Sequence, residues 1–391
     1  MKKNLLKRIG AVALSVAVSL TMGTAAFAAE LGDNGTVTAN DNSVTLKKAI
    51  EVTNYSGYAY EPTITYTYTL SNGTAGGTVT DDSNPAITAH YKEGKTTYLT
   101  SDAVQTAVFS SANAVTGSTA SKDLKWTFDP SAFPAAGVYR YVVAETATSV
   151  TPASIGVVRP DTYDTSKFLD VYVKNGDNGL EIYGYALVDK DTTGVTSASK
   201  KSQGWNATTE GQDDLDKYKT YNITITKNIT GAGADMTAEF PFTVALTGNM
   251  SAANIAVDGT GSDIGIASGS VTGKLGNGET LIIKGLPKTV TFDVSEDNPT
   301  PDTYKATATV SGVTVDSKAE GADLANEPIA VVTGGHVSTA TTSPITIDVE
   351  NNLGTISPTN VVMRFAPFLF IFGAAILLLV VMRRRRTQDA E

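Results

Sequence analysis

Three predicted strands in the second half of the chain each place one polar or charged residue on an otherwise apolar face. Alternate residues of a strand share a face. The three faces consist of Tyr221, Ile223, Ile225, Lys227 and Ile229, of Val290, Phe292, Val294 and Glu296, and of Ile345, Ile347, Val349 and Asn351. A lysine, an acid and a carboxamide are therefore expected inside one sandwich. Because burying an unpaired ammonium or carboxylate is costly, these groups should be paired or chemically altered.

The first half of the chain repeats this pattern. Lys48, and not Lys47, shares a face with Leu46 and Ile50, and Glu145 shares one with Tyr139, Tyr141 and Val143. The third member is either Asp216, where the closing strand should end, or Asn206, which follows Trp205. The ordinary alternative for each set is a salt bridge or hydrogen-bonded group at a strand end, with the lysine reaching outward to solvent. The recurrence of the same kinds of residue in both halves favours buried, chemically altered groups over this alternative.

The surrounding sequence is typical of β-strands. Thr, Val and Tyr alternate with period two, the runs are broken by Gly/Asn/Asp clusters such as residues 175–179, and helical periodicity is absent before residue 365. We therefore predict an all-β fold of two tandem immunoglobulin-like antiparallel β-sandwiches.

The two sandwiches begin with similar motifs. These motifs are Leu46-Lys47-Lys48-Ala49-Ile50 and Ile225-Thr226-Lys227-Asn228-Ile229. In each, a proline follows fourteen residues after the lysine, at Pro62 and Pro241. We expect the domains to span residues 31–217 and 218–352, with a polar loop over 189–214.

The amino-terminal end predicts export. Residues 1–28 combine four early basic residues, an apolar run over 9–22 and the small-x-small site Ala26-Phe27-Ala28, as in a secretory signal peptide. The alternative is a retained membrane anchor, for which the apolar run is short.

The carboxyl-terminal segment, residues 353–391, predicts a membrane span. A pentad at 356–360 precedes an apolar stretch over 365–382 and four arginines at 383–386. Eighteen residues at ~1.5 Å each just span a bilayer core, and the arginines hold the tail on the cytoplasmic side. Taken alone, this pattern also fits a plain single-span membrane protein.

Composition excludes several function classes. With no Cys and two His among 391 residues, disulfide frameworks, cysteine proteases and histidine-rich metal sites are not expected. We expect no metal and no cofactor. The net charge of −10 becomes more negative without the two ends, which carry nine bases and two acids. Such an acidic surface argues against nucleic acid as a partner.

Several motifs together resemble a known family. They are Leu46-Lys47-Lys48-Ala49-Ile50, Gly137-Val138-Tyr139-Arg140-Tyr141-Val142-Val143-Ala144-Glu145, Ile225-Thr226-Lys227, Val294-Ser295-Glu296-Asp297 and Val349-Glu350-Asn351-Asn352. The set resembles the isopeptide-linked domains of Gram-positive, sortase-assembled pilins. The first domain is similar to the streptococcal pilin type and the second to collagen-adhesin-B (CnaB) domains.

This resemblance implies a chemical role for each inward residue. In the family, a lysine amine bonds to an asparagine or aspartate side chain, assisted by a buried acid. Carried over, Lys227 bonds to Asn351 with help from Glu296, and Lys48 bonds to Asp216, or to its rival Asn206, with help from Glu145. The streptococcal-type domain typically uses asparagine, from which Asp216 departs.

The reaction is chemically reasonable without an enzyme. An apolar pocket lowers the pKa of a lysine and raises that of a glutamate, and the neutral acid polarises the carbonyl and moves the proton. Folding supplies the high effective molarity. The reaction happens once, so the resemblance implies a structural protein and not an enzyme.

The carboxyl-terminal segment is similar to the cell-wall sorting signal of Gram-positive surface proteins. In that family a sortase cuts after the threonine of Leu-Pro-x-Thr-Gly and joins it to an amine. Cleavage here would fall between Thr359 and Asn360, although Ile356, Ser357 and Asn360 depart from the usual pattern. The receiving lysine of a pilin lies near the end of its first domain, where this chain has Lys200 and Lys201.

We therefore predict a pilin subunit or pilus-associated protein, secreted and anchored to the cell wall, with a sortase and other pilin subunits or peptidoglycan as partners. The alternative is a singly anchored adhesin or stalk whose first domain binds a host ligand, for which the segment 55–60 is rich in tyrosine. An exported enzyme is not expected, because no pair of acids has distinctive spacing.

Overall fold

The computed structural model describes only part of the chain. The described residues are 36–37, 42–54, 57–75, 79–81, 84–87, 91–189, 201–202, 204–205, 208–209, 212–213, 215–300, 302–324 and 327–354. The predicted signal peptide, pentad, apolar segment 365–382 and basic tail all lie outside them. Within the described part, no helix is long and apolar enough to cross a membrane.

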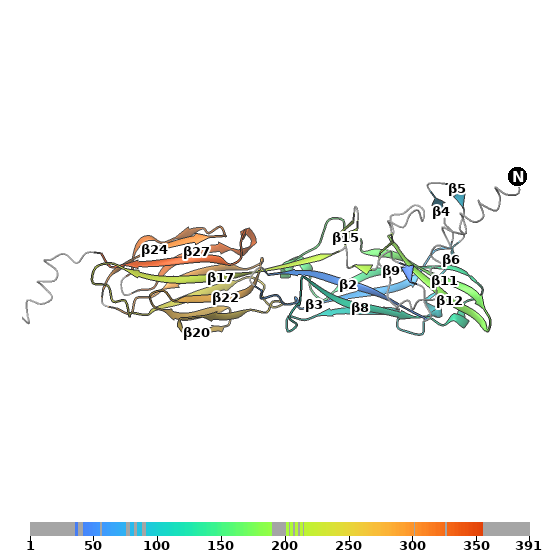
Figure 1. The fold of residues 1–391 in the computed structure, drawn as a ribbon, viewed down its shortest axis with the longest axis horizontal. Coiled ribbons are helices and arrows are strands. Elements are labelled where there is room, and N and C mark those ends of the chain that lie inside the picture. The colour runs from blue at the N-terminus through green and yellow to red at the C-terminus, as the bar shows by residue number, and fades with distance from the viewer. Residues whose placement is uncertain are drawn as a thin grey trace, which may run out of the picture. The chain divides into compact units, whose positions relative to one another are not determined.

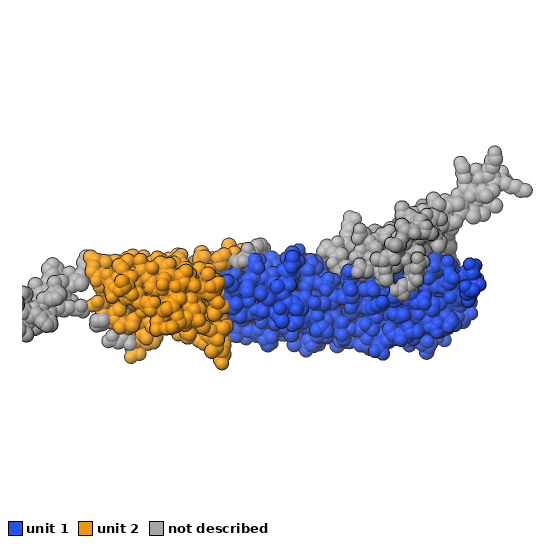
Figure 2. All heavy atoms as spheres, turned by 60° about the horizontal axis from the view of Figure 1, so that its bottom comes forward, with its two compact units in different colours: residues 1–222, 248–256, 284–290 blue, residues 223–247, 257–283, 291–391 orange. Residues whose placement is uncertain are grey.

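The described residues form β-strands almost throughout, which confirms the predicted all-β class (Figure 1). Short 3-10 turns interrupt them at η1 (Thr96–Tyr98), η2 (Pro130–Ala132), η3 (Pro152–Ile155) and η5 (Val337–Thr339). The chain divides into two compact units, coloured blue and orange in Figure 2. Unit 1 comprises residues 1–222, 248–256 and 284–290, and unit 2 comprises residues 223–247, 257–283 and 291–391.

Unit 1 contains two sheets. The order of the first is β1 (Thr36–Val37), β12 (Gly179–Asp189), β11 (Ser166–Gly176), β9 (Gly137–Thr148), β3 (Ile64–Asn72) and β7 (Val104–Phe109), with β13 (Lys201–Ser202) on β12 and β6 (Lys92–Glu93) on β9. The second contains β8 (Thr119–Thr127), β2 (Ser43–Thr53), β14 (Gly204–Trp205), β10 (Val157–Val158) and the first residues of β17 (Asp216–Thr230). Two small ladders are β4 (Val79–Asp81) with β5 (Asn84–Ile87) and β15 (Thr208–Thr209) with β16 (Gln212–Asp213).

The core of unit 1 is unusually aromatic. Alternating residues of β3 and β9 project inward and are fully buried, as are aromatic residues of β8 and β14; the largest are Tyr66, Tyr68, Tyr139, Tyr141, Trp126 and Trp205. Tyr and Trp place a large apolar area in a core but also bring hydroxyl and indole groups that need partners.

Unit 2 also contains two sheets. One has the order β19 (Ala256–Gly259), β22 (Thr280–Pro287), β17, β28 (Ile345–Asn352), β24 (Tyr304–Ser311) and β26 (Glu320–Leu324). The other has the order β20 (Ser262–Ala267), β21 (Ser270–Leu275), β18 (Phe240–Thr247), β23 (Thr291–Glu296), β27 (Ile329–His336) and β25 (Ser317–Lys318). Buried apolar residues of both sheets, such as Phe242, Val294 and Ile347, form its core.

The strand that carries Lys48 and the strand that carries Lys227 each pair in parallel with the last strand of their unit, which we call its closing strand. Residues 50–53 of β2 pair with 216–219 of β17, and residues 223–230 of β17 pair with 345–352 of β28. The sequence predicted antiparallel sandwiches, and most other pairings are antiparallel. Period-two alternation reports which face a residue occupies but not the direction of the neighbouring strand, so these parallel pairs were missed.

The two parallel pairs have the same register. Asp216 stands opposite Ile50, two residues after Lys48, and Asn351 stands opposite Ile229, two residues after Lys227. Side chains two residues apart lie on the same face of a strand. In both units the backbone therefore brings the lysine and the acid or amide to the same face of adjacent strands.

Candidate cross-link centres

The centre of unit 2 is a fully buried group of three side chains. Lys227 of β17, Glu296 at the end of β23 and Asn351 of β28 have no exposed surface. Lys227 Nζ lies 2.8 Å from Glu296 Oε1, and Asn351 Nδ2 donates a hydrogen bond of 2.7 Å to the same oxygen. One carboxyl oxygen thus contacts both the amine and the amide.

The remaining polar atoms of this centre are not satisfied. Lys227 Nζ is at ion-pair distance from Glu296 but makes no well-aligned hydrogen bond, and Glu296 Oε2 and Asn351 Oδ1 have no hydrogen-bond partner among the described residues. The ring of Phe240 lies 4.7 Å from Lys227 Nζ. Buried polar atoms without partners are rare and costly, so this arrangement is one that a covalent change would relieve.

Burial pushes the acid and the amine of unit 2 toward their neutral forms. Desolvation lowers the pKa of Lys227 to about 8, although Glu296 opposes the shift. Desolvation raises the pKa of Glu296, although Lys227 and Asn351 favour its charged form. A neutral amine is a nucleophile and a neutral carboxyl group is a proton donor, which is the pair that amide formation requires.

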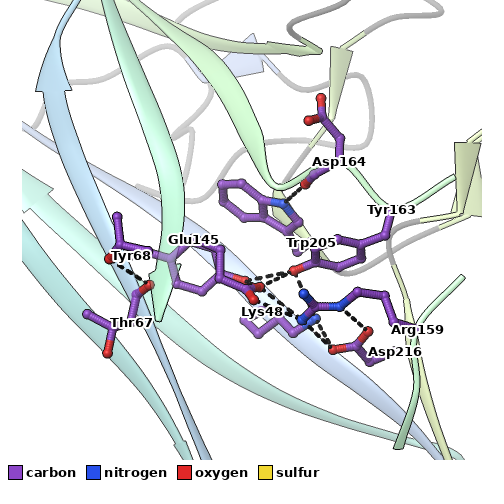
Figure 3. Close-up of polar contacts among 10 residues, drawn as sticks. Lys48, Thr67, Tyr68, Glu145, Arg159, Tyr163, Asp164, Trp205 and Asp216 are labelled. Carbon is purple, nitrogen blue, oxygen red and sulfur yellow. Dashed lines mark hydrogen bonds and ion pairs between the residues drawn. The ribbon is translucent and has the colours of Figure 1, made fainter. Parts of the chain in front are cut away.

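The centre of unit 1 also contains a buried lysine, but the side chains around it differ from those in unit 2 (Figure 3). Lys48 of β2 and Asp216 at the start of β17 are fully buried, and Lys48 Nζ donates a hydrogen bond of 2.9 Å to Asp216 Oδ2. The rings of Tyr66 and Tyr163 lie 4.6 and 4.7 Å from Nζ. The lysine is therefore enclosed by its acid and two aromatic faces.

The predicted assisting acid, Glu145, reaches this centre through tyrosine hydroxyl groups. Glu145 Oε2 accepts hydrogen bonds of 2.5 Å from Tyr163 and 3.1 Å from Tyr68. Lys48 Nζ in turn donates to the Tyr163 hydroxyl at 3.3 Å. Tyr163 thus bridges Glu145 and Lys48, whereas Glu296 contacts its lysine directly.

Arg159, which sequence reasoning missed, contacts both acids of unit 1. Its Nε and Nη2 donate to the two oxygens of Asp216 at 3.2 and 3.3 Å, and Nη2 lies 2.9 Å from Glu145 Oε1. Burial by itself would raise the pKa of Asp216, but Lys48 and Arg159 outweigh burial and lower it. Burial lowers the pKa of Lys48 against the opposing effect of Asp216. The carboxyl group of Asp216 is accordingly held in its charged form.

The other predicted site residues are placed only in part. Asn206, Lys200, Thr359 and Asn360 lie outside the described residues. Lys201 belongs to β13, where it pairs with Val188. The structure therefore places Asp216 beside Lys48, whereas the rival Asn206 is not described.

A second inward lysine of unit 1 was also missed. Lys167 of β11 is fully buried, on the same face as Leu169 and Val171, and its Nζ lies 5.8 Å from the ring of Trp205. Its alternation with those apolar residues is the signal that would have found it.

Across the described part of the chain, no cluster of three or more acidic or imidazole side chains could hold a metal ion.

Comparison with known families separates the two units. Residues 96–203 match the model of the Spy0128-like isopeptide containing domain, which confirms the predicted similarity of the first domain to streptococcal pilin-type isopeptide domains. The matched range includes Glu145 and Arg159 but neither Lys48 nor Asp216. Residues 221–328 match the model of a domain of unknown function (DUF7601). The CnaB-like character of the second domain stays a prediction.

Solved structures of Streptococcus pyogenes pilins are among the matches. The major pilin T3.2 is 21% identical, with 81% of this chain and 99% of that chain covered and a TM-score of 0.46. The major pilin T-13 is 19% identical, with 82% and 99% covered and a TM-score of 0.44. No curated protein matches the chain. The similarity of the first domain to streptococcal pilin-type isopeptide domains therefore rests on the family model over residues 96–203.

Proposed function

We propose that this chain is a structural pilin subunit or pilus-associated protein whose units are closed by intramolecular isopeptide bonds. The observation that carries the proposal is the centre of unit 2, where a fully buried carboxyl oxygen of Glu296 contacts both the amine of Lys227 and the amide of Asn351. The match of residues 96–203 to an isopeptide-containing domain supports the same interpretation for unit 1.

The reaction in unit 2 joins an amine to a carboxamide. The neutral Nζ of Lys227 attacks Cγ of Asn351 while protonated Glu296 polarises the carbonyl oxygen. The bond from Cγ to Nδ2 then breaks, Glu296 carries the amine proton to the departing nitrogen, and one ammonia leaves. Glu296 ends in its starting form, and the product is a secondary amide between β17 and β28. Because the fold holds both reacting groups at one carboxyl oxygen of Glu296, effective molarity replaces a separate enzyme.

In unit 1 the corresponding pair is Lys48 and Asp216. Joining Nζ to Cγ breaks a carbon–oxygen bond of the carboxyl group and releases one water. Glu145 assists through the hydroxyl of Tyr163, which contacts both Glu145 and Lys48. The register shared with unit 2 favours Asp216 as the partner.

Each bond would fasten the first strand of a unit to its closing strand. A pulling force on the chain ends acts on these strands, and a covalent link carries it without separating the sheet. By analogy with a disulfide that closes a loop of about a hundred residues, the link in unit 2 would stabilise the fold by about 5 kcal/mol. This is the property required of a Cys-free protein exposed to shear and proteases outside the cell.

Attachment to other molecules would use the two chain ends. The signal over residues 1–28 directs export, and the apolar segment 365–382 holds the chain in the membrane until a sortase cuts between Thr359 and Asn360. The new carboxyl group is then joined to peptidoglycan or to a lysine of another subunit, for which Lys200 and Lys201 are the candidates.

Electrophoresis of cell-wall extracts tests this assembly role. A polymer gives a ladder of covalent species on denaturing gels, and Thr359→Ala should remove it. One discrete wall-bound band would contradict polymerisation and indicate a singly anchored adhesin or stalk.

A further inference from the structure

Arg159 occupies a position in unit 1 that bears directly on the proposed bond. Its guanidinium group bridges the carboxyl groups of Asp216 and Glu145, with contacts of 2.9–3.3 Å, and stacks over the ring of Tyr163 at 4.0 Å (Figure 3). Two of its nitrogens face the two oxygens of Asp216, the group that must react with Lys48.

Unlike Lys48 and Asp216, Arg159 is partly open to solvent. Its side chain is 26% exposed, whereas Lys48 and Asp216 are fully buried. The arginine lines a pocket of about 310 Å³ in unit 1, together with Pro152, Val158 and Lys288. It therefore lies between the buried pair and solvent.

The contacts of Arg159 oppose the chemistry of an amide-forming step. A carboxylate resists attack by an amine, because the reacting carbon must first lose the negative charge on its oxygens. Bidentate contacts from an arginine and a further contact from Lys48 stabilise that charge in the starting state. In unit 2 the reacting group is a neutral amide, and its described polar contact is to Glu296.

We infer that Arg159 restrains bond formation in unit 1, by holding Asp216 as a carboxylate, so that Lys48 and Asp216 condense more slowly than Lys227 and Asn351. The inference rests on the proposed isopeptide chemistry. The step itself balances without any added reagent: the ammonium of Lys48 and the carboxylate of Asp216 become one amide and one water. Arg159 keeps its proton throughout and acts only on the charge of Asp216.

The test compares the two bonds within one molecule. The full chain is made by cell-free synthesis, samples are unfolded at successive times, and digested peptides are weighed to measure the linked fraction of 48 with 216 and of 227 with 351. We expect the unit 1 bond to lag behind the unit 2 bond. Arg159→Gln should speed the unit 1 bond by about tenfold, which corresponds to one lost charge-assisted contact, and leave the unit 2 bond unchanged.

Two further variants test whether charge is the cause. Arg159→Lys keeps a cation and should keep the lag. Asp216→Asn retains Arg159 but cannot be held as a carboxylate, so it should link without a lag and release ammonia.

Two results would overturn the inference. One is a wild-type unit 1 that links as fast as unit 2. The other is slower or unchanged linking in folded Arg159→Gln, as expected if the arginine stabilised the transition state; should that variant not fold, a wild-type lag in Asp216→Asn would overturn the inference equally. Should 227 and 351 stay unlinked while Arg159→Gln still speeds unit 1, the proposed closure of unit 2 fails and the role of Arg159 stands.

Discussion

The two units place a lysine in the same backbone register and then surround it with different charges. In unit 2, one buried acid contacts a lysine and a neutral amide, and burial drives the acid and the amine toward neutrality. In unit 1, two acids face Lys48 and Arg159, and tyrosine hydroxyl groups fill the remaining positions. The comparison shows that parallel pairing of the first and closing strands sets proximity, while neighbouring side chains set the ionisation on which reactivity depends.

The charges of unit 1 make it a stable ion-pair network even without a covalent bond. Breaking a buried pair by removing one partner leaves an uncompensated charge, which is strongly destabilising. The centre of unit 2 has no arginine contact among the described residues, and each of its three side chains keeps one polar atom without a hydrogen-bond partner there. We therefore expect the covalent bond to matter more for the stability of unit 2 than for that of unit 1.

The largest expected effect is that of Glu296→Ala. Without the acid, Lys227 and Asn351 should stay unlinked. The mass of the variant should therefore lack the loss of one ammonia, relative to the mass calculated from the sequence, that the unit 2 bond causes in the wild type. The loss of the cross-link should lower the stability of unit 2 by about 5 kcal/mol and its melting temperature by roughly 15 °C, with unit 1 unaffected. Intact mass and differential scanning calorimetry measure the two effects.

Glu350→Gln is the matched control for that variant. Glu350 is the exposed neighbour of Asn351 on β28 and accepts a hydrogen bond from Thr230. Its replacement should leave the bond and the melting temperature of unit 2 nearly unchanged. An equal loss in both variants would mean that the position of Glu296 in the centre is irrelevant.

A smaller effect is expected when the tyrosine bridge of unit 1 is broken. Tyr163→Phe removes the hydroxyl that contacts Glu145 and Lys48, and should destabilise unit 1 by about 2 kcal/mol, the cost of a lost hydrogen bond to a charged group. Tyr218→Phe is the control, because the buried Tyr218 hydroxyl has no hydrogen-bond partner in the described part of the chain. Equal stability of the two variants in calorimetry would rule out the bridge.

The rate of bond formation in unit 2 should depend on pH. Lys227 attacks only as a neutral amine, and its pKa is lowered to about 8. Below that pH the neutral fraction falls about tenfold per unit, so the rate should rise with pH up to about 8 and then level off. Burial raises the pKa of Glu296, which favours its proton-donating form over a wider pH range than that of an exposed carboxyl group. Time courses of the linked peptide at several pH values measure this, and a flat profile would contradict it.

The smallest effect is expected at an exposed lysine–acid pair of unit 2. Lys274 and Asp263 form an ion pair in which both side chains are largely exposed, unlike Lys227 and Glu296. Lys274→Ala should leave the melting temperature of unit 2 nearly unchanged and leave Lys227 linked to Asn351. A large loss would show that exposed pairs, and not the buried centre, stabilise this unit.

Much of the unit 2 centre follows from the sequence alone. Strand parity identified Lys227, Glu296 and Asn351, because each interrupts an apolar face with clear period-two alternation. The structure places Lys227 and Asn351 at the same carboxyl oxygen of Glu296. The same rule selected Lys48 over Lys47, and Lys48 is the fully buried one. The all-β class follows from that alternation too.

The rest depends on contacts that alternation does not encode. Arg159 and Tyr163 lie outside the long strands, in the segment between β10 and β11, where no face can be read from spacing. Parallel pairing of the first and closing strands also escapes the pattern, because it depends on how the chain crosses between sheets. Charge compensation at a buried site is therefore predicted poorly even where the site itself is found.

The central claim is tested most directly by the peptides of the folded wild-type protein that carry residues 227 and 351. We predict that after complete digestion they are recovered as one branched species, one ammonia lighter than the sum of the two peptides. Recovery of the two as separate peptides of unaltered mass, from material shown to be fully folded, would contradict the account.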